Sequence, residues 1–196
     1  MAKAKQVRGM GGMDDAAHPA ILVMGVSGSG KTSVAVALAE RLGALFVEAD
    51  DHHPPANVAA MAKGIPLTDE LRRPWLEAVG EAVAERRAEG PVVLACSALK
   101  RRYRDVLRRR AGPLDVVHLT APRALIFGRM AARRDHFMPA ALLDSQIADL
   151  EAPGPAEDPV ILDAALPVDT LARHAATALA LRHPRLATRS HGGNVG

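Results

Sequence analysis

The sequence holds one cysteine and few aromatic residues, and both shortages exclude classes of protein. Cys96 is alone among 196 residues, so no internal disulfide can form, and this favours a reducing compartment. Aromatic side chains make up 3% of the chain, which leaves few platforms for stacking nucleic-acid bases. We therefore expect a cytoplasmic protein whose partner is not a nucleic acid.

Long apolar runs and a strong charge imbalance are also missing. No apolar stretch approaches the roughly 20 residues that span a bilayer, and the first residues lack the apolar core of a secretory signal. The net charge is only +3, and the hydrophobic fraction of 48% is ordinary for a globular protein. We expect no membrane partner and one domain at 19–182, between disordered tails at 1–18 and 183–196.

The segment from Gly25 to Thr32, G-V-S-G-S-G-K-T, fits the phosphate-binding pattern G-x-x-x-x-G-K-[ST]. Glycines let the backbone curl around phosphate oxygens, and the N–H groups then form an anion nest. Lys31 adds positive charge near the β and γ phosphates, and the Thr32 hydroxyl can ligate Mg²⁺. We predict binding of ATP and Mg²⁺. The ATP-binding residues expected here are Gly25, Val26, Ser27, Gly28, Ser29, Gly30, Lys31, Thr32 and Ser33.

Short apolar runs alternate with longer helical segments. Strands are predicted near 20–24, 45–47, 91–95, 114–119 and 159–162, and helices after the phosphate loop and near 55–63, 68–89, 98–110, 122–134, 139–150 and 167–181. This alternation predicts an α/β fold with a five-stranded parallel sheet between two layers of helices. Parallel sheets bind ligands beyond the carboxyl ends of their strands, so Gly25, Asp50 and Ser97 should meet at one rim.

Asp50 is the leading candidate for chemistry outside the loop. A kinase needs a carboxylate near the γ-phosphate, either to organise Mg²⁺ or to accept the proton of the substrate hydroxyl. Asp50 follows the second predicted strand and suits both roles, so we expect Thr32 and Asp50 at the metal. The alternative is a turn or capping aspartate before two prolines. His53 is interpreted as a substrate contact, because no cysteine cluster completes a zinc site.

Lys100 to Arg110 contains seven basic residues. One interpretation is a nucleic-acid patch, and the other is a solvated helix face. Lys100 and Arg104 are four residues apart near the start of the predicted helix, so they share a face and are within reach of an anionic substrate at the rim.

Arg129 and Arg133 form a second pair at helical spacing. We predict that a lid at about 133–140 brings these arginines onto the phosphates of ATP, where they neutralise charge in the transition state. Both are therefore added to the ATP-binding residues. The alternative is a pair of ordinary surface arginines.

With these residues identified, the chain resembles the bacterial gluconokinases over about residues 21–180. Six motifs carry the resemblance: M-G-V-S-G-S-G-K-T at 24–32, D-x-x-H-P-x-x-N at 50–57, M-A-x-G-x-P-L-x-D at 61–69, R-x-P-W-L at 72–76, C-S-A-L-K-x-x-Y-R-D at 96–105 and R-x-x-H-F at 133–137. The first motif is shared by many kinases, whereas the H-P-x-x-N and C-S-A-L-K segments are far more specific.

The resemblance implies a P-loop kinase fold similar to nucleoside monophosphate kinases and shikimate kinases, with an arginine-bearing lid. It also implies transfer of a phosphoryl group from ATP to D-gluconate, giving 6-phospho-D-gluconate. The catalytic residues would then be Lys31, Asp50 and Arg133, and the substrate-binding residues Asp50, His53, Arg72, Ser97, Lys100 and Arg104. Two departures from the family pattern are Glu48-Ala49-Asp50 in place of Asp-Gly-Asp, and Asp135 in place of a glycine. The first leaves open whether Glu48 helps to hold Mg²⁺.

Two other functions remain as alternatives. Shikimate kinases are similar but carry a glycine triplet after the third strand, where this chain has Cys96-Ser97-Ala98. A nucleotide-dependent nucleic-acid-binding module would use the basic stretch, and the scarcity of aromatics argues against it. The oligomeric state stays open, with a homodimer as one alternative.

Overall fold

The computed structural model describes residues 18–132 and 143–186. The strands are β1 (Ala20–Met24), β2 (Leu45–Glu48), β3 (Val92–Ala95), β4 (Asp115–Thr120) and β5 (Val160–Asp163). The helices are α1 (Lys31–Leu42), α2 (Pro55–Ala62), α3 (Asp69–Arg87), α4 (Arg101–Ala111), α5 (Arg123–Ala132), α6 (Leu143–Asp149) and α7 (Val168–Arg182), with short 3₁₀ turns η1 (Ala49–His52) and η3 (Pro155–Glu157). The predicted elements are confirmed, with small differences at their ends.

The five strands form one parallel sheet in the order β2-β3-β1-β4-β5. Leu22 of the central strand β1 lies opposite Leu94 of β3 and Val116 of β4. All five residues of β1 are buried, as expected for a parallel strand covered on both faces. The chain leaves β1 first toward β2 and β3 on one side and later toward β4 and β5 on the other. A ligand crevice is therefore expected at the carboxyl end of β1.

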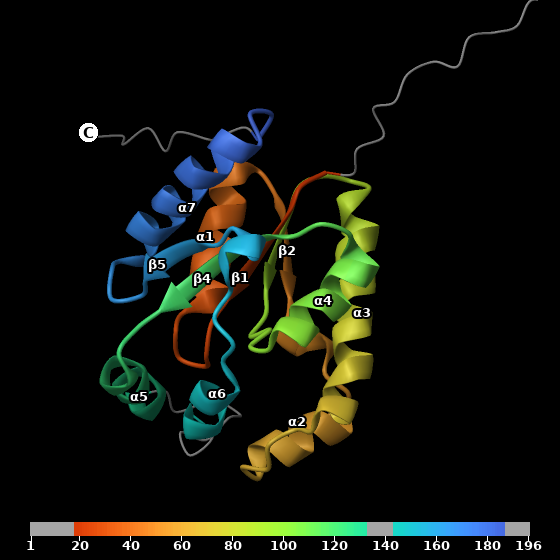
Figure 1. Ribbon diagram of the computed structural model, residues 1–196, viewed down its shortest axis with the longest axis vertical. Helices are drawn as coiled ribbons and strands as arrows, with labels where there is room; N and C mark the ends of the chain where they lie inside the picture. Colours follow the sequence, from red (N-terminus) through yellow and green to blue (C-terminus); the bar gives the residue numbers. More distant parts are fainter. Residues whose placement is uncertain (1–17, 133–142, 187–196) are drawn as a thin grey trace, which may run out of the picture.

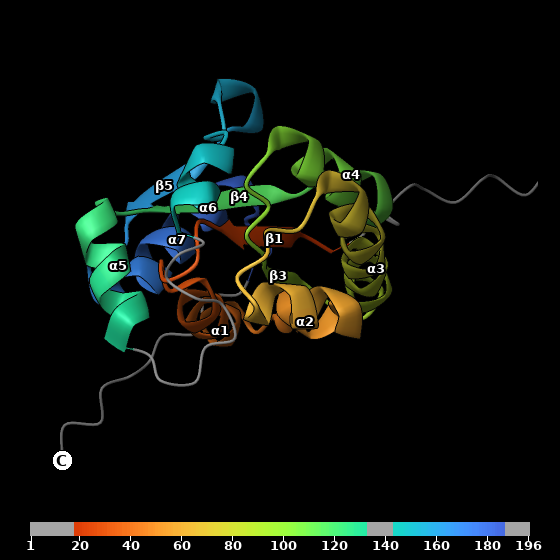
Figure 2. The ribbon, with the colours of Figure 1, turned by 90° about the horizontal axis from the view of Figure 1, so that it is seen from below.

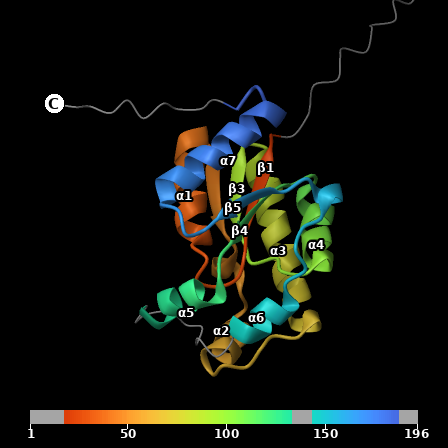
Figure 3. The same ribbon diagram turned by 60° about the vertical axis from the view of Figure 1, so that its left-hand side comes forward.

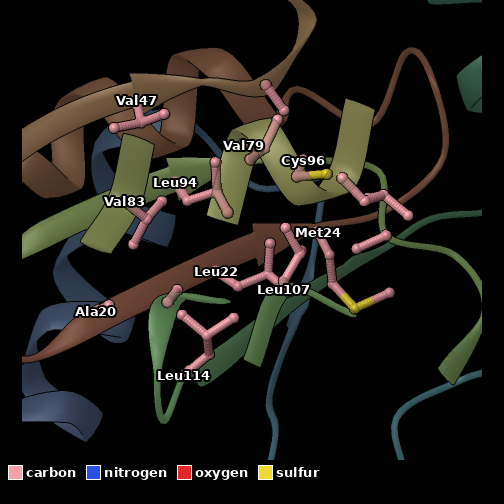
Figure 4. Close-up of a cluster of buried hydrophobic side chains, with 14 of the residues drawn as sticks. Ala20, Leu22, Met24, Val47, Val79, Val83, Leu94, Cys96, Leu107 and Leu114 are labelled. Atoms are coloured by element: carbon pink, nitrogen blue, oxygen red, sulfur yellow. The ribbon is translucent and has the colours of Figure 1, made fainter. Parts of the chain in front are cut away.

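Helices cover both faces of the sheet and complete the three layers (Figure 1). Helices α1 and α7 pack together on one face, and α3 and α4 pack together on the other. Each pair buries its own apolar stripe, because the sheet separates two clusters of buried side chains. Figure 4 shows one of them, where Leu22 of β1 and Leu94 of β3 lie near Val79 of α3 and Leu107 of α4. These two cores fix the strands relative to the helices.

The carboxyl ends of the strands carry the remaining helices. In Figures 1 and 3, α2, α5 and α6 lie at the lower end of the molecule, whereas the C-terminal end of α7 lies at the upper end. Figure 2 looks onto this end and shows α6 between α5 and α2. The strand ends are therefore framed by three separate helices.

Three predictions lie outside the described residues. The lid at about 133–140 and most of both tails fall there, so these stay predictions. Helix α7 ends at Arg182, the last residue of the predicted domain. Within the described ranges, no helix combines the length and apolar character that crossing a membrane would need.

Candidate active site

The phosphate loop joins the end of β1 to the start of α1. Gly30 caps α1 with φ of 91°, and Gly28 has φ of 83°, a region that side chains rarely adopt. A Cβ at Gly28 would lie 2.7 Å from Cγ of Met130, because α5 packs directly over the loop. The Lys31 ammonium donates to the Val26 carbonyl at 3.2 Å. At these glycines the turn exposes backbone without a side chain. The backbone N–H groups of the turn lie at the N-terminus of α1, an arrangement that suits a phosphate.

Three oxygen-bearing side chains meet beside this loop. The Thr32 hydroxyl donates to Oε2 of Glu48 at 2.8 Å, and the backbone N–H of Asp50 lies 3.4 Å from Oε1 of the same carboxylate. Burial raises the pKa of Glu48, and the charge of Asp50 raises it further, although the Thr32 hydrogen bond lowers it. Oxygen ligands with excess negative charge are what Mg²⁺ prefers. Glu48, whose role the sequence left open, thus places a carboxylate beside Thr32 and the backbone of Asp50.

The His53 ring is stacked on Trp75 opposite these carboxylates. The ring centroids are 4.0 Å apart with an interplanar angle of 14°, and the indole N–H of Trp75 donates to the Ala49 carbonyl at 2.7 Å. Burial lowers the pKa of His53 to about 4, despite Asp50, whose Oδ1 lies 3.9 Å from Nε2. Within the described part of the chain, buried Nδ1 of His53 has no hydrogen-bond partner. His53 is therefore neutral at physiological pH, and the residue lines the cleft described below.

Arg72 enters the site from the first turn of α3. Its Nε donates to the Leu67 carbonyl at 3.2 Å, and its guanidinium lies 5.6 Å from the centroid of the Tyr103 ring. Asn57 of α2 is buried and donates to the Leu71 carbonyl at 3.1 Å, which fixes α2 against the start of α3. Among the residues that the structure describes, no carboxylate pairs with Arg72. Its charge is available to an anionic ligand.

An open cleft brings these groups together. Its walls come from the phosphate loop, the segment after β2, helices α2, α3 and α6, and the end of β3. The lining residues are Ser27, Gly28, Gly30, Lys31, Thr32, Ser33, Asp50, His53, Met61, Pro66, Leu67, Arg72, Trp75, Ser97, Ser145 and Gln146. The predicted meeting of strand ends at one rim is confirmed, because Asp50 and Ser97 face the phosphate loop across this cleft.

A second cleft lies on the α5 and α7 side of the same loop. Arg129 lines it, so the structure places this predicted residue beside the phosphate loop. The lining residues are Gly28, Ser29, Gly30, Ser33, Val34, Arg129, Ala164, Leu166, Val168 and Leu171. The other predicted arginine, Arg133, lies outside the described residues.

The prediction that Arg104 binds the substrate is wrong. Its side chain is 1% exposed and forms a two-pronged ion pair with Glu157, at 2.8 and 2.6 Å. It also donates to three backbone carbonyls at 3.1 Å, those of Ala98, Leu99 and Glu151. The guanidinium is buried and bound on all three of its nitrogens, so it does not face a ligand, and it holds the segment after α6 onto α4.

Lys100 is misplaced by the same prediction. It is absent from the lining of the cleft, and its ammonium lies 3.4 Å from Oδ1 of Asp69 and 2.9 Å from Oδ1 of Asp149. A substrate carboxylate would have to displace two carboxylates that are already in place. The sequence shows the positive charge but not the acidic partners, which are distant along the chain.

Gln146 belongs to the cleft and was missed by the sequence analysis. Its side-chain oxygen accepts the backbone N–H of Ser27 at 2.7 Å, and the side chain is buried. A single glutamine 119 positions from its partner carries no motif that would reveal this contact. Trp75, whose ring supports His53, also lines the cleft.

The basic stretch on α4 is largely neutralised by acidic neighbours. Besides Arg104, which is buried, Arg102 pairs with Asp69, Arg108 with Asp105 and Glu157, and Arg110 with Glu77 and Glu81. A patch that binds nucleic acid needs unpaired positive charge. The arrangement favours the interpretation as a solvated helix face.

Comparisons with known proteins agree with this geometry. A family model described as an AAA domain matches residues 21–153. The gluconokinase of Gluconobacter oxydans (strain 621H) is 50% identical over 142 residues, which cover 72% of this chain and 79% of that protein.

Two solved structures are also similar. An unliganded sugar kinase from Janibacter sp. HTCC2649 has a TM-score of 0.81 at 47% identity, covering 88% of this chain and 99% of its own. A gluconokinase from Sinorhizobium meliloti 1021 has a TM-score of 0.76 at 47% identity, covering 87% and 96%.

Proposed function

The chain belongs to the gluconokinase family, and we propose that it transfers the γ-phosphoryl group of ATP to the 6-hydroxyl of D-gluconate. The observation that carries the proposal is the cleft in which the phosphate loop faces Asp50, His53, Arg72 and Ser97. These are the groups needed for a nucleotide, a proton acceptor and a polyhydroxy acid. Two of the three named relatives are gluconokinases, and this chain is 50% and 47% identical to them over the aligned residues.

The phosphate loop and Lys31 would hold the phosphates of ATP. Thr32 and Asp50, with Glu48 beside them, fit a hard cation and would hold Mg²⁺, which neutralises charge on the transferred phosphoryl group. The second cleft would take the adenine base, since it shares the phosphate loop with the first and has the apolar side chains of Leu166 and Val168. These assignments place the triphosphate between the two clefts.

Asp50 would accept the proton from the attacking hydroxyl. The substrate oxygen forms a bond to the γ-phosphorus, the bond from that phosphorus to the β–γ bridging oxygen breaks, and ADP leaves with the electron pair. The hydroxyl proton moves to the Asp50 carboxylate. Asp50 lines the same cleft as Lys31 and Thr32, which supports this role.

Arg72 would pair with the carboxylate of gluconate. A carboxylate taken from water needs a cation, and Lys100 and Arg104 are bound to acidic residues elsewhere. Neutral His53 and the Ser97 hydroxyl suit the substrate hydroxyls, because each can donate one hydrogen bond and accept another. The substrate would then lie with its acid end toward α3 and its 6-hydroxyl toward Asp50.

Release of ADP across a panel of D-gluconate, shikimate and nucleoside monophosphates tests the proposal. We expect gluconate to be strongly preferred, and turnover of shikimate at an equal rate would overturn the assignment. Arg72→Met should raise KM for gluconate about 30-fold or more, corresponding to about 2 kcal/mol, with little effect on KM for ATP. The matched control is Arg73→Met, because Arg73 is 72% exposed and pairs with Glu77 alone among the described residues.

The proposal includes a cytoplasmic location and no nucleic-acid partner. Cys96 is buried, and burial raises the pKa of its thiol to about 12, so it stays a protonated core side chain. The ion pairs that neutralise the arginines of α4 support the expectation that no nucleic acid binds there.

A further inference from the structure

Lys100 stands between two helices that serve different halves of the cleft. Its ammonium lies 3.4 Å from Oδ1 of Asp69, the first residue of α3, and 2.9 Å from Oδ1 of Asp149, the last residue of α6. Its side chain is only 18% exposed, and it does not line the cleft. The residue therefore acts on the site through other groups.

Asp69 leads to the half of the cleft assigned to gluconate. It lies one helical turn before Arg72, and it accepts the Tyr103 hydroxyl and pairs with Arg102. The Tyr103 hydrogen bond lowers the pKa of Asp69, and Lys100 and Arg102 lower it further. Asp69 is therefore a carboxylate that ties the start of α3, and Arg72 with it, to the start of α4.

Asp149 leads to the half assigned to the nucleotide. Gln146 lies one turn earlier on α6 and accepts the Ser27 N–H of the phosphate loop at 2.7 Å. Leu143, at the start of α6, is buried in the same apolar cluster as Val26 of that loop. Figure 2 shows α6 between α5 and α2, over the strand ends. The position of helix α6 therefore determines where the Ser27 N–H of the phosphate loop points.

We propose that Lys100 is a positioning residue that couples the two subsites, fixing α3 through Asp69 and α6 through Asp149. The inference rests on the proposed function, because gluconate is assigned to the α3 side and ATP to the loop. When one ligand binds and restricts the motion of one helix, Lys100 restricts the motion of the other helix as well. The second ligand then loses less conformational entropy on binding, so each ligand should bind more tightly in the presence of the other. The coupling between the two ligands depends on the ion pairs of Lys100 with Asp69 and Asp149.

A purely structural Lys100 makes a different prediction. Its loss would then lower the stability of the fold, or weaken each ligand alone, but leave the ratio between the affinities with and without the second ligand unchanged. This ratio, the coupling factor, is the quantity to measure. It is the Kd of gluconate for the free protein divided by its Kd with a non-hydrolysable ATP analogue and Mg²⁺ bound.

The experiment compares the wild type with Lys100→Met, Lys100→Arg and Arg102→Met by titration calorimetry. The wild type should show a coupling factor of about 5 or more, the lower end of the usual range. Lys100→Met should bring it close to 1 and lower kcat about tenfold, while KM measured for either substrate changes less. Lys100→Arg should restore most of the coupling, since it keeps the charge.

Arg102→Met is the matched control. Arg102 also pairs with Asp69, but it is 59% exposed and forms no ion pair with α6 among the residues that the structure describes, so its loss should leave the coupling factor unchanged. A wild type without coupling, a Lys100→Met protein that keeps it, or an equal loss in Arg102→Met would each overturn the inference. Failure of the proposed function looks different, because the wild type would then release no ADP with gluconate.

Discussion

Replacing Arg104 by methionine separates a structural role from substrate binding. Methionine keeps much of the side-chain volume and removes the guanidinium. Glu157, whose side chain is 5% exposed, then loses both hydrogen bonds to Arg104 and, among the described residues, keeps Arg108 at 2.8 Å. Three carbonyl oxygens lose a donor at the same time.

The magnitude follows from the Glu157 carboxylate. Hydrogen bonds from Arg104, aided by Arg108, lower the pKa of Glu157 from 4.5 to about 2. That lowering corresponds to about 3 kcal/mol of stability at neutral pH, part of which Arg108 keeps. The three carbonyls add about 1 kcal/mol each at most. We expect Arg104→Met to lose about 4 kcal/mol, within the usual cost of breaking one side of a buried ion pair.

Urea unfolding followed by circular dichroism measures this loss. The difference between wild type and variant should shrink as pH falls from about 4.5 toward 2, because the unfolded chain takes up a proton on Glu157 below about 4.5 whereas the folded wild type does so only near 2. The control Arg110→Met should lose less than about 1 kcal/mol, since Arg110 is 46% exposed. A variant as stable as wild type but with a raised KM for gluconate would refute the structural role of Arg104.

Three further substitutions, one of them with a matched control, test the site. Asp50→Asn should lower kcat about a hundredfold or more while the ATP analogue still binds, because the proton acceptor is removed; calorimetry that shows lost nucleotide binding instead would contradict this role. Gly28→Ala should abolish most ATP binding and lower the free energy of unfolding by about 2 kcal/mol, since its Cβ would lie 2.7 Å from Met130. The control Gly30→Ala has open space around its Cβ and only a φ of 91°, so it should lower the free energy of unfolding by about 1 kcal/mol. Equal shifts of the thermal melting temperature would show that the contact with Met130 is unimportant. His53→Phe keeps the stack on Trp75 and removes both nitrogens, so KM for gluconate should rise about tenfold. Because the pKa of His53 is about 4 when folded and 6.5 when unfolded, the stability of wild type relative to this variant should fall as pH drops from about 6.5 to 4, and parallel pH profiles would contradict that.

The features that the sequence predicts well are local. Apolar runs such as Ala20–Met24 mark the buried strands, and the glycine and lysine pattern marks the phosphate loop. Asp50 and Ser97 are predicted correctly at the cleft because both follow strands of a parallel sheet, and all carboxyl ends of such a sheet share one edge. The strand order was not predicted, because periodicity does not say which strands are neighbours.

The features that fail depend on partners distant along the chain. Arg104 and Lys100 carry the right charge and helical spacing for an anionic substrate, but Glu157 and Asp149 take up that charge in the folded protein. Gln146 was missed because its role depends on α6 lying over the phosphate loop. Charge and spacing reveal a group that is able to bind, whereas only the fold reveals whether that group is already occupied.

Phosphorus NMR of the product tests the central claim most directly. The purified protein is incubated with ATP, Mg²⁺ and D-gluconate, and the spectrum is recorded with proton coupling. Transfer to the 6-hydroxyl predicts formation of ADP and of a phosphomonoester whose signal is a triplet, because the ester carbon carries two protons. A doublet would place the phosphate on a secondary hydroxyl, and formation of inorganic phosphate without an ester would contradict the proposed transfer to gluconate.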